Sequence, residues 1–419
     1  MEFLPNQNRE YLNDKLVFFT YPFKTIDDIN ELFFAGRSPF FNKISKEYPK
    51  EGKEFIKYFP QLINLVKDID KLFPDKGVPT LKTGKNALLK MSRKHVALIF
   101  LLSFLGVIEP KKSLNKNYFN VSLLLWYSTQ GSHFHFGLCF LNYLTVIGRW
   151  LAEKNPILND IIIYKRKNIN STNYLSNLPE EKLCEINLIT KKESLFNGNA
   201  TYCIDFANKY IGGGVLNGGC VQEEILFAVE PEAIVSLFFM EVMNDGDTIG
   251  IYNLIQYSKY KGYGFNFTYE GCSIDDKTLI NKRQRIIAID AIDLRMQISN
   301  NDLKKEINRD IHKAFVGFSL ANDEPFPKTI ATGNWGCGAF NGNHELKFIQ
   351  QLIAASLAKL DRLDYYTFGD QKTILIEKYY KNILDKYKSV KDLYNALMRV
   401  SVYRGNYITN LLNLYSPKN

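Results

Sequence analysis

Two adjacent carboxylates follow a glycine-rich loop near the middle of this chain. The loop, Gly212 to Gly219, holds five glycines in eight residues, and Glu223 and Glu224 come shortly after it. Glycine lets backbone amides approach a ligand closely and adopt positive φ without strain. A loop of this kind that leads into a helix supplies unpaired N–H groups and a positive dipole end, which suit phosphate. The segment therefore predicts an enzyme with acid–base chemistry beside a bound phosphate group.

The two glutamates cannot play the same role, because adjacent helical positions point about 100° apart. A helix N-terminus stabilises an ionised carboxylate, whereas a neighbouring carboxylate and a bound diphosphate raise the pKa of a group that must donate a proton. That tension suits a general acid in glycoside cleavage. The alternative is that both glutamates only complement the helix dipole, as many N-terminal glutamates do.

Further polar and glycine-rich positions follow two other expected strands. Asp205 interrupts an apolar run, so it needs a polar partner if it is buried, and Asn208 follows it into the loop. Both residue types also commonly form turns or cap helices. A second glycine-rich segment, Gly333 to Gly342, follows an apparent strand and precedes a helix. Its amides could cradle a diphosphate, although an ordinary tight strand-to-helix turn is the alternative.

Four separated blocks carry a family resemblance. They are the triple glycine Gly212 to Gly214 with Gln222-Glu223-Glu224, then residues 256–263, 331–340 and 366–370. In this order they resemble the signature of the poly(ADP-ribose) glycohydrolases, over roughly residues 75 to 400. The short loop before Gln222 contains paired glycines, which departs from the family in detail but keeps the spacing.

The resemblance implies roles for individual residues. Glu224 would be the acid–base residue, Glu223 would hold ribose hydroxyls, and Asp205 would complete the catalytic group. Tyr263 and Phe368 would contact adenine, although aromatic residues form 14% of the chain and any single one is more often part of the core. The full set expected to bind substrate is Asn208, Gly212, Gly213, Gly214, Gln222, Tyr263, Asn334, Gly338, Ala339, Phe340 and Phe368. Within it, Gly338, Ala339 and Phe340 would lie along the diphosphate.

The activity implied by the resemblance is cleavage of ribose–ribose O-glycosidic bonds in poly(ADP-ribose), which releases ADP-ribose. The enzyme would act mainly from the free end of the polymer, need no cofactor or metal, and serve reversal of this modification, as in the DNA damage response. A non-catalytic module of the same fold that binds ADP-ribose is the alternative. A nucleotide-dependent oxidoreductase fits less well, since the G-x-G-x-x-G spacing fails at Asn217.

The composition limits which classes of partner are expected. The net charge of +9, from 53 basic and 44 acidic residues, favours an anionic partner or serves solubility alone. No lysine and arginine stripe is dense enough to argue for direct DNA binding. Six scattered cysteines without a CxxC pair indicate reduced, mostly buried thiols and an intracellular protein, nuclear and/or cytoplasmic. His133 and His135 would share one face if their segment is a strand, but no third ligand is near, so no metal site is expected.

The elements expected to position these residues fall into two parts. Residues 1–175 should form a mainly helical accessory region, in which the apolar run 96–106 is a buried helix too short to span a bilayer. From residue 176 to 419, strands at 182–190, 200–206, 249–255 and 285–290 alternate with helices at 221–243 and 343–360. This pattern predicts an α/β domain. The resemblance adds a macrodomain-like mixed sheet flanked by helices, in a monomer that binds poly(ADP-ribose) and ADP-ribosylated proteins and no membrane.

Overall fold

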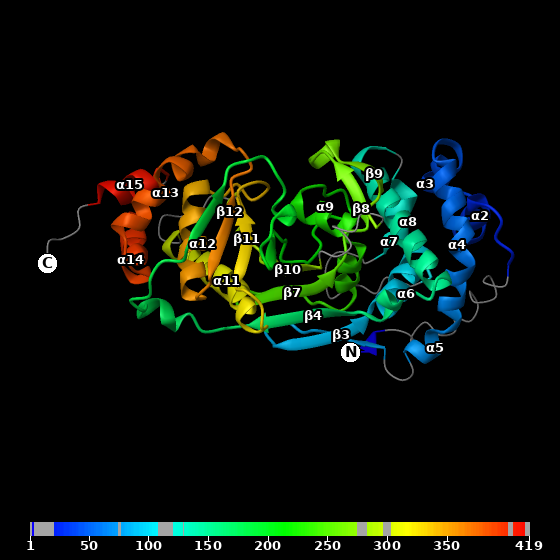
Figure 1. Cartoon of the computed structure of the whole chain (residues 1–419), viewed down its shortest axis with the longest axis horizontal. Coiled ribbons are helices and arrows are strands. Elements are labelled where there is room, and N and C mark those ends of the chain that lie inside the picture. The colour runs from blue at the N-terminus through cyan, green and yellow to red at the C-terminus, as the bar shows by residue number, and fades with distance from the viewer. Residues whose placement is uncertain are drawn as a thin grey trace.

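An eight-stranded mixed sheet forms the centre of the molecule (Figure 1). The computed structural model describes residues 2–3, 21–73, 77–107, 120–128, 130–274, 283–295, 303–400 and 405–414. The strand order is β3 (Ala87–Ser92), β4 (Ile161–Asn168), β7 (Asp247–Leu254), β10 (Gln284–Ala288), β6 (Tyr202–Asp205), β11 (Thr329–Gly333), β12 (Arg362–Tyr366) and β5 (Ile186–Ile189). The strands from β10 to β5 are parallel, and β7, β4 and β3 add to one edge by antiparallel pairing.

Helices lie at both ends of the sheet in the view of Figure 1. At one end are α2 (Ile26–Phe34), α3 (Pro39–Glu47), α4 (Pro49–Lys67), α5 (Ile69–Leu72), α6 (Arg93–Phe104), α7 (Val121–Tyr127) and α8 (Gly131–Ala152). At the other are α11 (Leu303–Phe318), α12 (His344–Leu357), α13 (Ile374–Lys386), α14 (Val390–Val400) and α15 (Tyr407–Asn413). Between them lie α9 (Gln222–Val229) and the two-stranded sheet of β8 (Ser258–Lys261) and β9 (Thr268–Cys272). A further short pair joins β1 (Glu2–Phe3) to β2 (Val78–Pro79).

Both faces of the sheet are buried, against different cores. Successive residues of a strand point to opposite faces. Accordingly Cys203 belongs to the core formed with the N-terminal helices, whereas Tyr202 and Ile204 belong to the core formed with α11 and α12. Apolar burial on both faces explains why the central strands are short, nearly continuous apolar runs.

Most elements expected from the sequence are present. Ser92 caps α6 by accepting a hydrogen bond from the backbone of His95, and the apolar run that follows is buried on all sides. The expected strands correspond to β5, β6, β7 and β10 with bounds shifted by a few residues, and the helix expected at 343–360 is α12. All six cysteines are free and five are buried, as predicted.

Two interpretations of local secondary structure do not hold in the structure. The expected helix at 221–243 ends at Val229, because Pro231 lacks a backbone N–H and starts a 3₁₀ helix, Pro231–Phe238. His133 lies in α8 rather than in a strand, so His135 points away from it on the helix. The N-terminal region is mainly helical, as predicted, and in addition it contributes β3 and β4 to one side of the central sheet.

The strand β4, second from the edge of the sheet, is held by a buried ion pair that the sequence does not reveal. Arg166 is fully buried and donates to the carboxylate of Asp247 at 3.0 Å. Its other contacts are backbone carbonyls, including that of Leu81 at 2.9 Å. Because β3 and β4 precede residue 175 and still pair with the sheet, the division of the chain near that residue stays a prediction. Among the described helices, none is both long and apolar enough to cross a membrane.

Candidate active site

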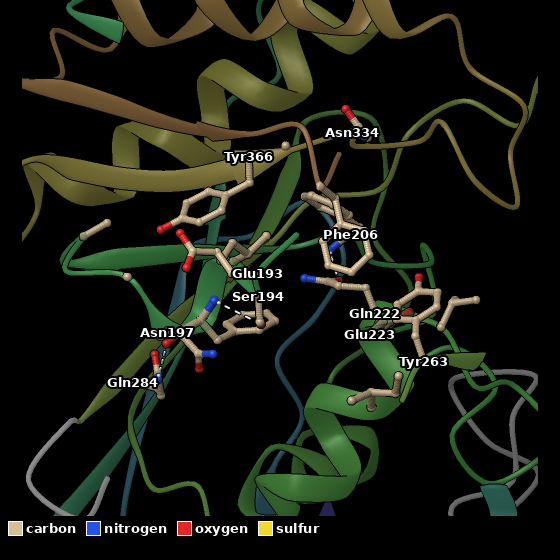
Figure 2. A pocket seen from close by; sticks show the side chains of 18 of the residues that line it. Glu193, Ser194, Asn197, Phe206, Gln222, Glu223, Tyr263, Gln284, Asn334 and Tyr366 are labelled. Carbon is tan, nitrogen blue, oxygen red and sulfur yellow. Dashed lines mark hydrogen bonds between the residues drawn. The ribbon is translucent and has the colours of Figure 1, made fainter. Parts of the chain in front are cut away.

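A cavity of about 1720 Å³ is lined by residues that follow the carboxyl ends of β6, β11 and β12, and it extends to residues at the amino ends of β6, β10 and β11. In open α/β sheets ligands bind at the carboxyl ends of the strands. The cavity lining includes ten of the residues expected at the site, which are Asn208, Gln222, Glu223, Glu224, Tyr263, Asn334, Gly338, Ala339, Phe340 and Phe368. Figure 2 shows Gln222, Glu223 and Tyr263 on one side of the pocket and Asn334 on another. The fold therefore brings together blocks that lie far apart in the sequence.

Glu223 is fixed by the loop that precedes it. Its side chain is nearly buried, at 2% exposure, and its two oxygens accept hydrogen bonds from the backbone N–H groups of Asn208 at 2.8 Å and Gly212 at 2.7 Å. Burial raises the pKa of Glu223 well above its usual value, and the nearby Asp205 carboxylate raises it further. Glu223 is thus a positioned group whose two oxygens already have donors.

Glu224 lies on the third position of α9 and lines the same cavity. One oxygen accepts from the backbone N–H of Gly214 at 2.8 Å, and the other accepts from that of Val221 at 2.9 Å. The second contact caps the helix, so the helix-stabilising role is part of what this side chain does. At 6% exposure the carboxylate is nevertheless on the cavity wall, where it can meet a ligand.

The glycines around these carboxylates leave room for them. A methyl group on Gly213 would lie 2.5 Å from Glu223 Oε2 and would also collide with Glu224 Oε1. One on Gly219 would lie 2.6 Å from Glu224 Oε1. Since the amides of Gly212 and Gly214 donate to the carboxylates, the triple glycine holds the acidic pair in this structure. The substrate-binding role expected for Gly212, Gly213 and Gly214 stays a prediction.

Asp205 lies behind the pair, at the end of β6. It is fully buried, and neither carboxylate oxygen has a hydrogen-bond partner within the described part of the chain. Burial without a donor raises the pKa of Asp205 well above its usual value, and the charge of Glu224 adds to the effect. Because Glu223 accepts two backbone N–H hydrogen bonds and Asp205 accepts none within the described residues, a proton shared between these two carboxyl groups is best placed on Asp205.

Contacts with β12 and α12 hold the second glycine-rich loop, residues 333–342, in place. The side-chain amide of Asn334 donates to the carbonyl of Thr367 at 3.0 Å, which ties the loop to the end of β12. Lys347 of α12 lies under the loop, with its Nζ 4.5 Å from the Trp335 ring, and forms a buried ion pair with Asp310. A methyl group on Gly338 would meet nothing within 4 Å, so this part of the loop is open to the cavity.

Comparison with known proteins decides the family. Residues 48–166 match the family model of the poly(ADP-ribose) glycohydrolase helical domain, and residues 174–374 match that of its macro domain fold. The chain belongs to the poly(ADP-ribose) glycohydrolase family. The predicted macrodomain-like sheet and N-terminal helical part are thereby confirmed.

Curated relatives share this family name. The chain is 30% identical over 270 residues to poly(ADP-ribose) glycohydrolase 1 of Arabidopsis thaliana, which covers 48% of the chain and 49% of the relative. It is 35% identical over 228 residues to poly(ADP-ribose) glycohydrolase 2 of Caenorhabditis elegans. This match covers 50% of the chain and 46% of the relative. Poly(ADP-ribose) glycohydrolase 1 of C. elegans is 39% identical over 181 residues. This match covers 40% of the chain and 23% of the relative. The chain therefore spans about half the length of the first two relatives and less than a quarter of the third.

An aromatic pair stands where the poly(ADP-ribose) glycohydrolase family resemblance places the adenine. The ring centroids of Tyr263 and Phe368 are 6.1 Å apart, and the rings are tilted by 48°. Their exposed fractions are 49% and 39%, so neither ring is part of a core. Phe368 has a φ of +57°, which is uncommon for an aromatic residue and typical of functional turns. The adenine role of both rings stays a prediction.

Replacing Tyr263 tests that role. Tyr263→Ala should weaken ADP-ribose binding by about tenfold to a hundredfold, because base stacking contributes about 1–3 kcal/mol. Tyr263→Phe should have a much smaller effect, since it keeps the ring face. Calorimetric affinities together with melting curves provide the measurement. A lowered melting temperature with unchanged affinity would show that Tyr263 serves packing instead.

Sequence reasoning missed one whole wall of this cavity. Residues 192–201, Gln284, Arg285 and Phe326 line it, and the single Glu193 and Gly198 among them form no glycine-rich loop or acidic pair that could have indicated a site. His133 of α8 was also missed as a neighbour of the first glycine-rich loop, and burial there lowers its pKa, although the Gly219 backbone and the charge of Glu224 act in the opposite direction. Within the described ranges, no group of three or more His, Cys, Asp or Glu side chains could hold a metal ion.

Proposed function

We propose that this chain is a poly(ADP-ribose) glycohydrolase that cleaves ribose–ribose O-glycosidic bonds and releases ADP-ribose. The observation that carries the proposal is the placement of Glu224 on the wall of a large cavity, beside Glu223 and opposite a second glycine-rich loop. Membership of the family and the names of its relatives support the same substrate.

The proposed mechanism assigns the proton to Glu224. Its carboxyl group protonates the departing ribose oxygen as the bond from that oxygen to the anomeric carbon breaks. The oxocarbenium-like state is stabilised by the neighbouring diphosphate of the substrate. A water molecule then attacks the anomeric carbon and gives its proton to Glu224, which restores the acid. Glu223, whose two oxygens are fixed by Asn208 and Gly212, orients the ribose hydroxyls.

A binding module without catalysis is the second candidate. One observation favours it, because both oxygens of Glu224 already accept backbone hydrogen bonds in this structure. Cleavage requires Glu224 to exchange one of these two hydrogen bonds, either the one from Gly214 or the one from Val221, for a hydrogen bond to the substrate. Incubation with purified poly(ADP-ribose) and identification of the product decides between the two. Release of ADP-ribose supports the hydrolase, whereas saturable binding without product supports the module.

The partners and the compartment follow from this function as further proposals. Poly(ADP-ribose) and ADP-ribosylated proteins are the partners, direct DNA binding is not expected, and the chain acts as a monomer. The six free cysteines support an intracellular setting, nuclear and/or cytoplasmic. The helical region 1–175 would act as an accessory to the catalytic region 176–419.

Chelation distinguishes this site from a metal-dependent one. Full activity should survive an excess of EDTA and need no added nucleotide, because every proposed group is a side chain or a backbone amide. The measurement is the initial rate of ADP-ribose release before and after dialysis against EDTA, with no metal restored. A loss of activity that Mg²⁺ or Zn²⁺ restores would contradict the proposed mechanism.

A further inference from the structure

Phe368 lies on a turn that joins the end of β12 to a short 3₁₀ helix, Gln371–Thr373. We call residues 367–370 the aromatic turn. The positive φ of Phe368 is a conformation that aromatic residues rarely adopt, so contacts with the surrounding structure must hold the turn in place. Within the turn, the backbone N–H of Asp370 donates to the carbonyl of Thr367 at 3.1 Å. This hydrogen bond closes the turn but does not fix its place beside the rest of the cavity.

A contact from α12 connects the aromatic turn to the second glycine-rich loop. The Nε2 atom of His344 lies 3.2 Å from Oδ2 of Asp370, and both residues line the cavity. His344 is the first residue of α12, which begins directly after that loop. Asn343 caps this helix by accepting a hydrogen bond from the backbone N–H of Leu346 at 2.9 Å. The imidazole is therefore fixed at the start of a 14-residue helix and reaches from there to the turn that presents Phe368.

The contact between His344 and Asp370 is a hydrogen bond from a neutral imidazole at neutral pH. Because a carboxylate only accepts, the proton lies on Nε2 of His344. Burial lowers the pKa of His344, and the charge of Lys372 lowers it too, whereas Asp370 acts in the opposite direction. The loss of one such hydrogen bond typically changes an equilibrium constant by about fivefold. A side chain that keeps an N–H donor in the same place should therefore replace the imidazole.

The two ends of the aromatic turn are held unequally. At its first residue, the carbonyl of Thr367 accepts from the side chain of Asn334 at 3.0 Å, and the N–H of Thr367 donates to the carbonyl of Ile189 at 3.0 Å. At its last residue, Asp370, the hydrogen-bonded link beyond the following 3₁₀ helix is His344, among the residues that the structure describes. Removal of the imidazole therefore frees one end of the turn while the other end stays attached to the sheet.

We propose that His344 is a positioning residue, which acts through Asp370 to hold the ring of Phe368 opposite Tyr263 for stacking on adenine. The proposal rests on the proposed function, since it takes ADP-ribose as the ligand. His344 lies on α12 and Glu224 on α9, and no step of the proposed mechanism uses the imidazole. The pair therefore controls affinity for the adenine end of the substrate and leaves the cleavage step unchanged.

A double-mutant cycle with Phe368 tests this role. We expect His344→Ala to weaken calorimetric binding of ADP-ribose by about fivefold, the scale of one lost hydrogen bond. In a Phe368→Ala protein the same substitution should change affinity by less than about twofold, because the ring that it positions is absent. His344→Gln keeps an N–H donor near the place of Nε2 and should stay within about twofold of the wild type. His135→Ala, in a histidine of α8 that does not line the cavity, is the matched control and should bind normally.

Kinetics and melting curves complete the test. His344→Ala should cleave saturating poly(ADP-ribose) in a single turnover within about twofold of the wild-type rate. An equal loss of affinity with and without the Phe368 ring, or unchanged affinity in Phe368→Ala alone, would overturn the positioning role. A lowered melting temperature with unchanged affinity in His344→Ala would also overturn it, since the pair would then serve only the fold. Failure of the wild type to release ADP-ribose would overturn the hydrolase instead, and the cycle, which is measured by binding, would still decide the role of His344.

Discussion

Glu224→Gln should reduce the release of ADP-ribose by at least about 10²-fold, the scale of lost acid–base catalysis. Glutamine keeps the shape of the side chain but cannot donate a proton to the leaving oxygen. Affinity for ADP-ribose should stay within several-fold of the wild type. The measurements are single-turnover cleavage of poly(ADP-ribose) and calorimetric binding of ADP-ribose.

The hydrogen bonds of Glu224 make a stability control necessary. Both oxygens accept backbone N–H groups, whereas a glutamine side chain has only one oxygen that can accept. A melting curve therefore accompanies the kinetics, and Glu181→Gln, an exposed glutamate paired with Lys359, serves as the charge-matched control. Near-normal turnover in a folded Glu224→Gln protein would place the acid elsewhere. Glu223→Gln should also lose activity, partly through weaker positioning of the substrate.

The chemistry-bearing blocks could be predicted from the sequence because each is local. Gln222, Glu223 and Glu224 begin a helix directly after a glycine-rich loop, so spacing along the chain fixes their neighbourhood. The direction of the amides in Gly212 and Gly214 could not be predicted in this way. They donate to the carboxylates rather than standing free, because the loop folds back over α9.

The missed parts of the site depend on pairing between distant segments. Arg285 reaches the cavity only because β10 pairs with β6, and no local pattern specifies that register. The strand β4 was hidden for a similar reason, since its last residues are basic and Arg166 is buried only by pairing with Asp247. Burial of such charged groups requires a partner that only the tertiary structure supplies.

Gly213→Ala should abolish most activity, by about 10²-fold or more, although the substitution lies outside the acidic pair. The added methyl group would stand 2.5 Å from Glu223 Oε2 and would also collide with Glu224 Oε1, so both carboxylates must move. A displacement of about 1 Å at a reacting group can cost about 10²-fold in rate. The backbone adds strain, because φ is +50° and a residue with a Cβ pays about 1–2 kcal/mol in that region.

Gly405→Ala separates the collision from the backbone strain. Gly405 also has a positive φ, of +86°, but a methyl group there would meet nothing within 4 Å. Both variants should therefore lose some thermal stability, whereas only Gly213→Ala should lose turnover. If the two variants retained equal activity while folded, the carboxylates would not depend on the loop for their position. If Gly213→Ala alone is inactive and still binds ADP-ribose, the glycine is required because it leaves space for the acidic pair.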